Sequence, residues 1–267
     1  MRRGALVRFF FAAELRATAA WTVAFAAYNV LNIWLFTVYG KETSIAQVYE
    51  KLPRMWKSAF GRYFISVNSL EGWLAAQFFS FFPVVAGSWL AILCASLFTA
   101  DEETRAVVCL LTQPLRRSTL WSAKAGAAGA LLLALLGVNL GASLASAAAF
   151  TPGAAPFGVI LLTYALCALF LLFLAALFIA LAVSLRTQRS AVGAGLGALF
   201  LLFLLNMVAA TLELPAWVQG LNPFHYYDAS RLVRDRAIPP AAVLYWVAGA
   251  GILAAGSLLA FVRRERR

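Results

Sequence analysis

The sequence predicts an all-α integral membrane protein with six transmembrane helices. Of its 267 residues, 63% are hydrophobic and only 12% are charged, whereas soluble domains carry roughly 25% charged residues. The apolar residues fall in runs of about 20, the length at which an α-helix crosses the hydrocarbon core of a bilayer. Polar and apolar residues do not alternate within these runs, as they do in the strands of a membrane β-barrel, so we expect helices.

The predicted spans form a single membrane domain, residues 1–267. They cover 17–39, 77–99, 125–150, 157–185, 191–210 and 241–262. Several links between them are short, which predicts one helical bundle. Two longer loops, 40–76 and 211–240, fall on the side opposite the termini.

The segment before the first span predicts a short amphipathic helix at the membrane interface. We expect Leu6, Phe9, Phe10 and Leu15 to face lipid, and Arg8 and Arg16 to reach the lipid headgroups. Glu14 and Arg16 interrupt the apolar run where the core of a signal peptide would continue. The sequence therefore disfavours a cleaved leader.

Lysine and arginine residues predict the orientation of the chain. Cytoplasmic loops are enriched in these residues, and six spans place both termini on one side. That side carries 14 of the 22 Lys and Arg residues, although the other side has the longest loop. We therefore expect both termini and segment 100–124 on the cytoplasmic side of an inner or plasma membrane. The net charge of +11 then reflects topology, and it does not predict nucleic-acid binding, which needs a basic soluble surface.

Both outer loops contain residues suited to the membrane surface. In 40–76, apolar residues repeat at helical spacing, which predicts one or two helices lying in the outer interface. These helices are either a spacer or part of a substrate gate. In 211–240, three residues suit the aromatic belt of an interface: Phe224, Tyr226 and Tyr227.

The sequence lacks the signatures of nucleotide binding and hydrolysis. It contains no GxxxxGK[ST] phosphate-binding loop, no GxSxG elbow and no HExxH pair. Its one histidine, His225, and its three cysteines form no metal-binding motif. We therefore predict no catalytic residues and no metal site on this chain.

The polar residues inside the spans are neutral. The middle of each predicted span is free of charged residues and histidine, which disfavours a proton-driven carrier or an ion pump. Asn29 and Asn32 share one face of the first span, and Asn206 lies in the fifth. These asparagines either hydrogen-bond to neighbouring helices or line a substrate path.

Two GxxxG pairs predict close helix contacts. Gly137 and Gly141 form one in the third span, and Gly193 and Gly197 form another in the fifth. Small residues at this spacing let two helices approach closely. The contacts would be within one bundle or between two copies of the chain.

Segment 100–124 is a charged stretch between two long apolar runs, and it predicts a cytoplasmic helix. Acidic residues at its start complement a helix N-terminus, an apolar stripe follows, and a proline ends the helix. Basic residues come next. The residues concerned are Asp101, Glu102, Glu103, Thr104, Arg105, Leu110, Leu111, Pro114, Arg116 and Arg117.

This segment resembles the hallmark of the permease subunits of ABC-2 type transporters, in their six-span bacterial branch. The family pattern is similar to A-G-E-E-x-x-G-T-L-x-L-L-L-x-x-P-V-S-R, with a Lys a few residues later. The matching residues are Ala100, Glu102, Glu103, Leu110, Leu111, Pro114, Leu115, Arg117 and Lys124. Segments 70–83 and 222–231 also fit the family. The chain departs from the pattern at Asp101, Ala106, Val107 and Arg116.

The resemblance implies a permease subunit of an exporter of the type V, or ABC-2, architecture. The ATPase, with its ATP and Mg, would be a separate cytoplasmic subunit. Residues 101–113 would be the coupling helix that docks on this ATPase, with Arg116, Arg117 and Lys124 holding its base at the lipid headgroups. Alternating access between inward- and outward-facing states would follow from ATPase motion.

The resemblance also implies that two permease chains, identical or different, pair in the membrane. The first, second and fifth spans would line their interface, which makes Asn29, Asn32 and Asn206 candidate path residues. The uncharged spans favour a hydrophobic or lipid-like cargo over a small ion. Two alternatives stay open: a member of the same architecture that does mechanical or assembly work, and a membrane enzyme or channel without an ATPase.

Overall fold

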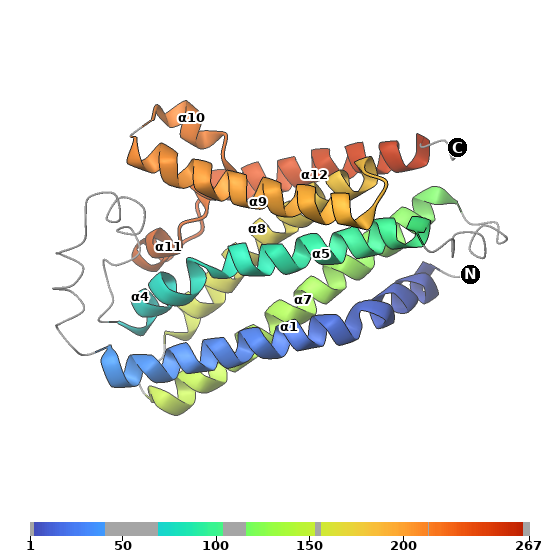
Figure 1. Ribbon diagram of the computed structural model, residues 1–267. Coiled ribbons are helices and arrows are strands. Elements are labelled where there is room, and N and C mark those ends of the chain that lie inside the picture. Colours follow the sequence, from blue (N-terminus) through green and yellow to red (C-terminus); the bar gives the residue numbers. More distant parts are fainter. Residues whose placement is uncertain (1–2, 41–68, 104–115, 153–155, 213, 264–267) are drawn as a thin grey trace.

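A computed structural model describes residues 3–40, 69–103, 116–152, 156–212 and 214–263 (Figure 1). The regular elements in these ranges are all helices, which confirms the predicted fold class. Among them, 6 are long and apolar enough to cross a membrane. They are Gly4–Tyr39, Leu70–Thr99, Arg117–Phe150, Phe157–Ser184, Gln188–Ala209 and Pro240–Arg263.

The first span, α1 (Arg3–Tyr39), is one continuous helix of 37 residues. The expected separate interfacial helix is absent from this described stretch, because no proline and no glycine after Gly4 interrupts the sequence before Tyr39. A helix of this length extends about 55 Å, well beyond the ~30 Å hydrocarbon core. Leu6 is 1% exposed and Phe10 is 4% exposed, so the expectation that these two face lipid was wrong, whereas Phe9 and Leu15 are exposed.

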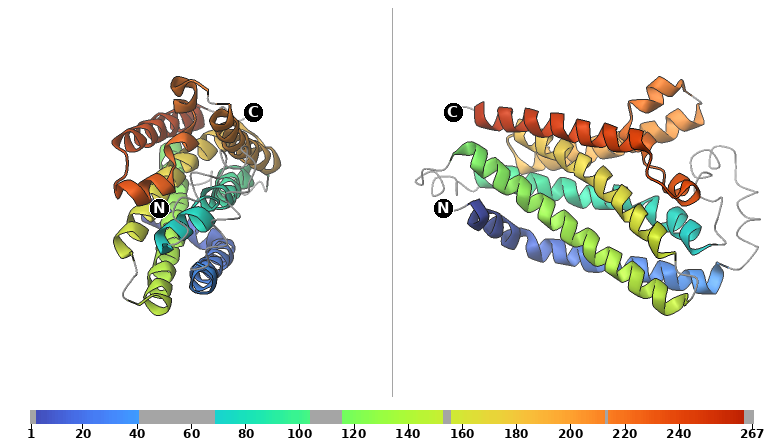
Figure 2. Two further views of the ribbon diagram at one scale, coloured as in Figure 1. Left: turned by 90° about the vertical axis from the view of Figure 1, so that its left-hand side faces the viewer. Right: turned by 180° about the vertical axis from the view of Figure 1, so that it is seen from behind.

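Helix α8 (Phe157–Ser184) lies at the centre of the bundle. Its sequence is apolar on all sides, as expected of a helix surrounded by other helices. It packs against α5 (Phe82–Glu103), α7 (Arg117–Phe150), α9 (Gln188–Thr211) and α12 (Pro240–Arg263). Helix α1 runs beside α7 on the far side of the bundle from α12 (Figures 1 and 2).

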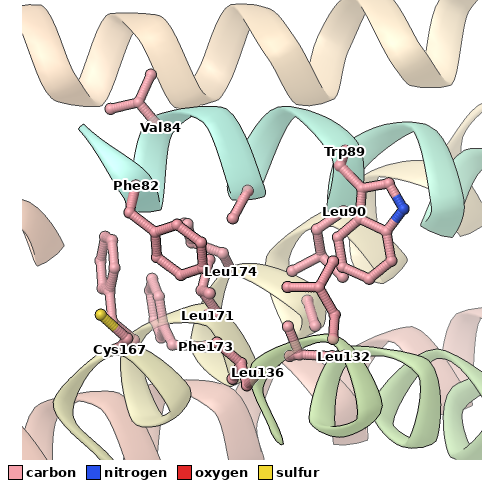
Figure 3. Close-up of a cluster of buried hydrophobic side chains, with 14 of the residues drawn as sticks. Phe82, Val84, Trp89, Leu90, Leu132, Leu136, Cys167, Leu171, Phe173 and Leu174 are labelled. Atoms are coloured by element: carbon pink, nitrogen blue, oxygen red, sulfur yellow. The ribbon is translucent and has the colours of Figure 1, made fainter. Parts of the chain in front are cut away.

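The core fills the space between α5, α7 and α8 (Figure 3). Aromatic and branched side chains from the three helices interdigitate there. Those drawn include Phe82, Trp89, Leu90, Leu132, Leu136, Cys167, Leu171 and Leu174.

Close helix contacts use glycines other than the predicted GxxxG pairs. A Cβ atom added at Gly137, Gly141, Gly193 or Gly197 would meet nothing within 4 Å. At Gly195, in contrast, it would lie 3.0 Å from the Cβ of Ala91 on α5. Positions two apart on a helix face different directions, so α9 packs on α5 through Gly195 and turns both members of its GxxxG pair outward. Contacts within the bundle are therefore not the role of these pairs.

The second span is interrupted. It consists of α4 (Leu70–Leu74), a π-helix η1 (Ala75–Phe79), a turn at Ser80 and Phe81, and α5. The break follows from Pro83, which has no N–H to continue the helical hydrogen-bond ladder.

The described part of the second outer loop folds back against the bundle. It contains α10 (Ala216–Gly220), the 3-10 helix η2 (Pro223–Tyr226) and α11 (Ala229–Asp235). The Asn222 amide donates to the Leu202 carbonyl at 2.7 Å, well before α9 ends. Phe224 and Tyr227 are consequently buried inside the protein, so their assignment to a lipid-facing aromatic belt was wrong.

Candidate functional site

The predicted coupling helix falls mostly outside the described residues. Residues 104–115 are not described, and with them lie Thr104, Arg105, Leu110, Leu111 and Pro114. The structure describes both flanks of this segment. The end of α5 and the start of α7 lie at the same end of the bundle as the start of α1 and the end of α12 (Figures 1 and 2).

The acidic residues that open the segment belong to α5. Asp101, Glu102 and Glu103 are helical and continue α5 without a break, whereas we expected them at the start of a new helix. They are the last residues described before segment 104–115.

The basic residues after the segment begin α7. Arg116 is exposed and forms the N-cap of α7. The Arg117 guanidinium donates to the Val262 carbonyl, at a distance of 3.2 Å, near the end of α12. A cation at a helix C-terminus is favourable, so Arg117 joins the start of α7 to the end of α12. Arg8 and Arg16 are exposed on α1.

Lys124 is not at the surface, so its assignment as a headgroup anchor was wrong. The residue is 2% exposed. Its Nζ lies 5.3 Å from the ring centre of Phe10 on α1 and 5.7 Å from that of Phe98 on α5. Such cation–π contacts are strongest when they are desolvated. Lys124 thus links three helices, and its spacing to the buried Ala128 and Leu131 on α7 indicates the inward face.

A second polar contact lies on the same end of the bundle. The Ser96 hydroxyl of α5 donates to the Glu14 carboxylate of α1 at 2.5 Å. The sequence showed Glu14 only as an interruption of an apolar run. Together with Lys124 and Arg117, this contact connects α1, α5, α7 and α12 on either side of the undescribed segment.

Truncation of Lys124 should destabilise this end of the bundle. We expect Lys124→Ala to lower the free energy of unfolding by about 2 kcal/mol or more, because it removes a desolvated cation and leaves a void. Arg8→Ala, which truncates an exposed cation on α1, should change it little. Thermal unfolding of both variants in detergent micelles measures the difference. Equal midpoints would show that Lys124 does not stabilise this end of the bundle.

Asn29 forms a buried polar cluster with α7 and α8. It is 0% exposed. Its amide nitrogen donates to the Tyr164 hydroxyl at 2.8 Å and to Ser143 Oγ, and it lies 3.4 Å from the Asn139 carbonyl. Ser143 and Tyr164 are themselves 2.9 Å apart. The alternative of an interhelical hydrogen bond is confirmed for Asn29, whose side chain is enclosed by the described residues around it.

The other two candidate path residues differ from Asn29. Asn32 is buried and its amide donates to the Tyr28 carbonyl of its own helix at 2.9 Å. Asn206 is half-buried on α9, next to the exposed Leu205. The structure therefore does not bring the three asparagines together around one path.

The described residues offer no metal centre. No group of three or more His, Cys, Asp or Glu residues among them could hold a metal ion. Cys94 and Cys167 are buried, and Cys109 lies outside the described ranges.

Comparison with known families decides what the chain is. The family model described as ABC-2 family transporter protein matches residues 10–261. The chain belongs to the ABC-2 transporter family. No curated protein matches it. Membership makes the chain a membrane-embedded permease component of an ABC transporter, a class whose ATPase is a separate subunit.

The permease has large exposed apolar faces on its outer helices. Helices α1, α9 and α12 each present such a face, and α9 and α12 are the least buried, whereas α5 is mostly buried and exposes single apolar residues. Lipid or a second chain covers surfaces of this kind in a membrane. The side chains include Val23, Leu31, Trp34, Val85, Ile92, Leu201, Leu204, Leu205 and Val208.

Proposed function

We propose that this permease is the membrane subunit of an ATP-driven exporter, moved by a separate ATPase that docks on residues 101–113. The observation that carries the proposal is the family match over residues 10–261. The position of both flanks of the segment at one end of the bundle supports it. ATP and Mg would bind to the ATPase subunit alone.

The contacts between these helix ends would make them move together when the ATPase moves. Lys124, Arg117 and the Ser96–Glu14 contact join α1, α5, α7 and α12 beside the docking segment. ATP binding would close two ATPase subunits, and the segment would move these helices together. This is a domain-scale change between two packed states.

A second permease chain, identical or related, would cover the exposed face of α9 and the exposed apolar residues of α5. Gly193 and Gly197 face away from their own bundle, and small residues of this kind allow close approach of a second helix. The substrate path would then run between two chains, with Asn206 as its remaining polar candidate. A hydrophobic or lipid-like cargo suits these walls, which are apolar in both α5 and α9.

The enclosed asparagine cluster also favours a second candidate. A permease with no polar path through its own bundle could transmit ATPase motion across the membrane as mechanical or assembly work. Movement of a solute in vesicles separates the two functions. A membrane enzyme or a channel without an ATPase would bind no ATPase at all.

The orientation supports docking from the cytoplasm. The end of the bundle that holds both termini carries the larger share of Lys and Arg, which favours the cytoplasmic side for it by the positive-inside rule. Arg8, Arg16 and Arg116 are exposed there, where anionic lipid headgroups are expected.

Co-purification tests the proposal. The permease expressed with the ABC ATPase encoded beside it should form a complex that survives purification, and it should raise the ATPase rate in nanodiscs. An ATPase that neither co-purifies nor responds to the permease would refute the proposed docking.

A further inference from the structure

The second span consists of two separate helical pieces. The outer piece, next to the outer loops, consists of α4 and the π-helix η1, and the inner piece is α5 (Figure 1). Ser80 and Phe81 form the turn between them. Single π-turns inside helices occur frequently at functional sites, so the cause and the partners of this break matter.

Pro83 leaves one backbone carbonyl without its helical donor. The carbonyl of Phe79, four residues earlier, would accept the N–H of residue 83 in a regular helix. Proline has no such hydrogen. The Ser80 hydroxyl donates to the Ala75 carbonyl, five residues earlier, at 2.6 Å. Side-chain hydrogen bonds therefore replace backbone hydrogen bonds across the break.

Two tyrosine hydroxyls from other elements hydrogen-bond to backbone carbonyls at the break. Tyr227, which follows η2, donates to the Phe79 carbonyl at 3.0 Å. The Tyr28 hydroxyl of α1 lies 3.4 Å from the Gln77 carbonyl oxygen. A buried carbonyl without a hydrogen-bond donor destabilises the fold. The Tyr227 hydroxyl supplies the donor that Pro83 lacks.

The packing around Tyr227 aims its hydroxyl at this point. The residue is 4% exposed, its ring lies 5.2 Å from that of Phe170, and its hydroxyl is also 2.9 Å from Cys167 Sγ. Both neighbours belong to α8. Tyr227 is thus one fixed side chain through which the outer loop reaches the break, beside the packing of α11 on η1.

The two pieces of the span pack on different neighbours. On the outer piece, the Trp73 indole donates to the Asn32 carbonyl of α1 at 3.1 Å, and Glu71 lies 3.7 Å from Arg236 after α11. The inner piece packs on α8 and α9, with Gly195 against Ala91. The two pieces thus differ in their contacts with α11 and α9, although Phe79 and Phe82 both lie against Tyr164 of α8.

We propose that the second span bends at Ser80 and Phe81, and that Tyr227 is the positioning residue that fixes the end of the outer piece, at Phe79, to the outer loop and α8. Release of the Phe79 carbonyl by Tyr227 frees the end of η1 from the outer loop at the point where the span bends. If the proposed function holds, a displacement of α5 by the ATPase reaches the outer loop through this contact. The bend itself does not depend on an ATPase.

Hydrogen–deuterium exchange of the full chain in nanodiscs, without an ATPase, tests the proposal. Tyr227→Phe should raise exchange roughly tenfold at the amides of residues 80–85, the change expected for one lost hydrogen bond to a buried acceptor. Tyr245→Phe is the matched control, because it removes a similar 2.8 Å bond to the Leu221 carbonyl, outside the second span. An equal rise in both variants, or none in Tyr227→Phe, overturns the proposal.

Pro83→Ala provides the decisive second variant. It restores an N–H for the Phe79 carbonyl, so we expect lower exchange at 80–85 than in the wild type. In Tyr227→Phe combined with Pro83→Ala, exchange should return to the wild-type rate. If Tyr227→Phe alone does not fold, Pro83→Ala still decides, since unchanged exchange there contradicts a bend caused by Pro83. Because no ATPase is present, this result is independent of whether the chain proves to be an exporter.

Discussion

Replacement of both Glu102 and Glu103 by lysine is expected to abolish stimulation of the partner ATPase while the bundle stays folded. The acids are the last described residues of α5, directly before the rest of the proposed docking segment. A basic or amide-rich surface on the ATPase gives them a role there. Loss of a charged partner inside an interface costs about 2–5 kcal/mol, which corresponds to at least tenfold weaker binding.

Asp235→Lys is the matched control for this charge reversal. It reverses an exposed acid on α11, at the opposite end of the bundle from the docking segment (Figure 1). The ATPase rate and the amount of co-purified ATPase should stay at wild-type levels in this variant. Unchanged binding and stimulation in the double glutamate variant would show that residues 101–113 do not couple the two subunits.

Asn29→Asp should be the most damaging single substitution inside the bundle. It keeps the size of the side chain but replaces the amide donor with an acceptor that faces Ser143, Tyr164 and the Asn139 carbonyl. An aspartate in the centre of a span costs about 2.5–3.5 kcal/mol on insertion scales. We therefore expect little folded protein, measured by monodispersity and thermal unfolding in detergent.

Asn29→Leu separates the two causes of this loss. It removes the same hydrogen bonds without adding a charge, and hydrogen bonds between membrane helices are worth only about 0.6–2 kcal/mol. The leucine variant should be folded but less stable than the wild type. Equal yields and unfolding midpoints for Asn29→Asp and the wild type would mean that the cluster is not buried in the membrane-embedded protein.

The number, type and order of the membrane helices could be predicted from the sequence because each is a long apolar run. The start of the third span could not, since Arg117 and Lys124 are charged and hydropathy excludes them. The helix nevertheless begins at Arg117, because the helix extends before its apolar run and Lys124 is covered by Phe10 and Phe98. Burial of a lysine against aromatic rings depends on tertiary packing, which hydropathy does not contain.

The role of the outer aromatic residues was equally hidden. Phe224 and Tyr227 suit a lipid interface by composition, but the Asn222 side chain ties their segment to α9 and directs them inward. The partner of the Tyr227 hydroxyl lies at Phe79, far away in the chain. The proline that creates the need for it, Pro83, was visible in the sequence. The donor that satisfies it became visible only in the fold.

Cross-linking from Cys109 tests the central claim most directly. This cysteine lies in the predicted docking segment, whereas Cys94 and Cys167 are buried, so a maleimide–benzophenone reagent should attach to Cys109 selectively. Illumination of the purified complex should then join the permease to the ATPase, and Cys109→Ser should abolish the product. A labelled Cys109 that cross-links to lipid or to a second permease chain, and never to the ATPase, would contradict the account.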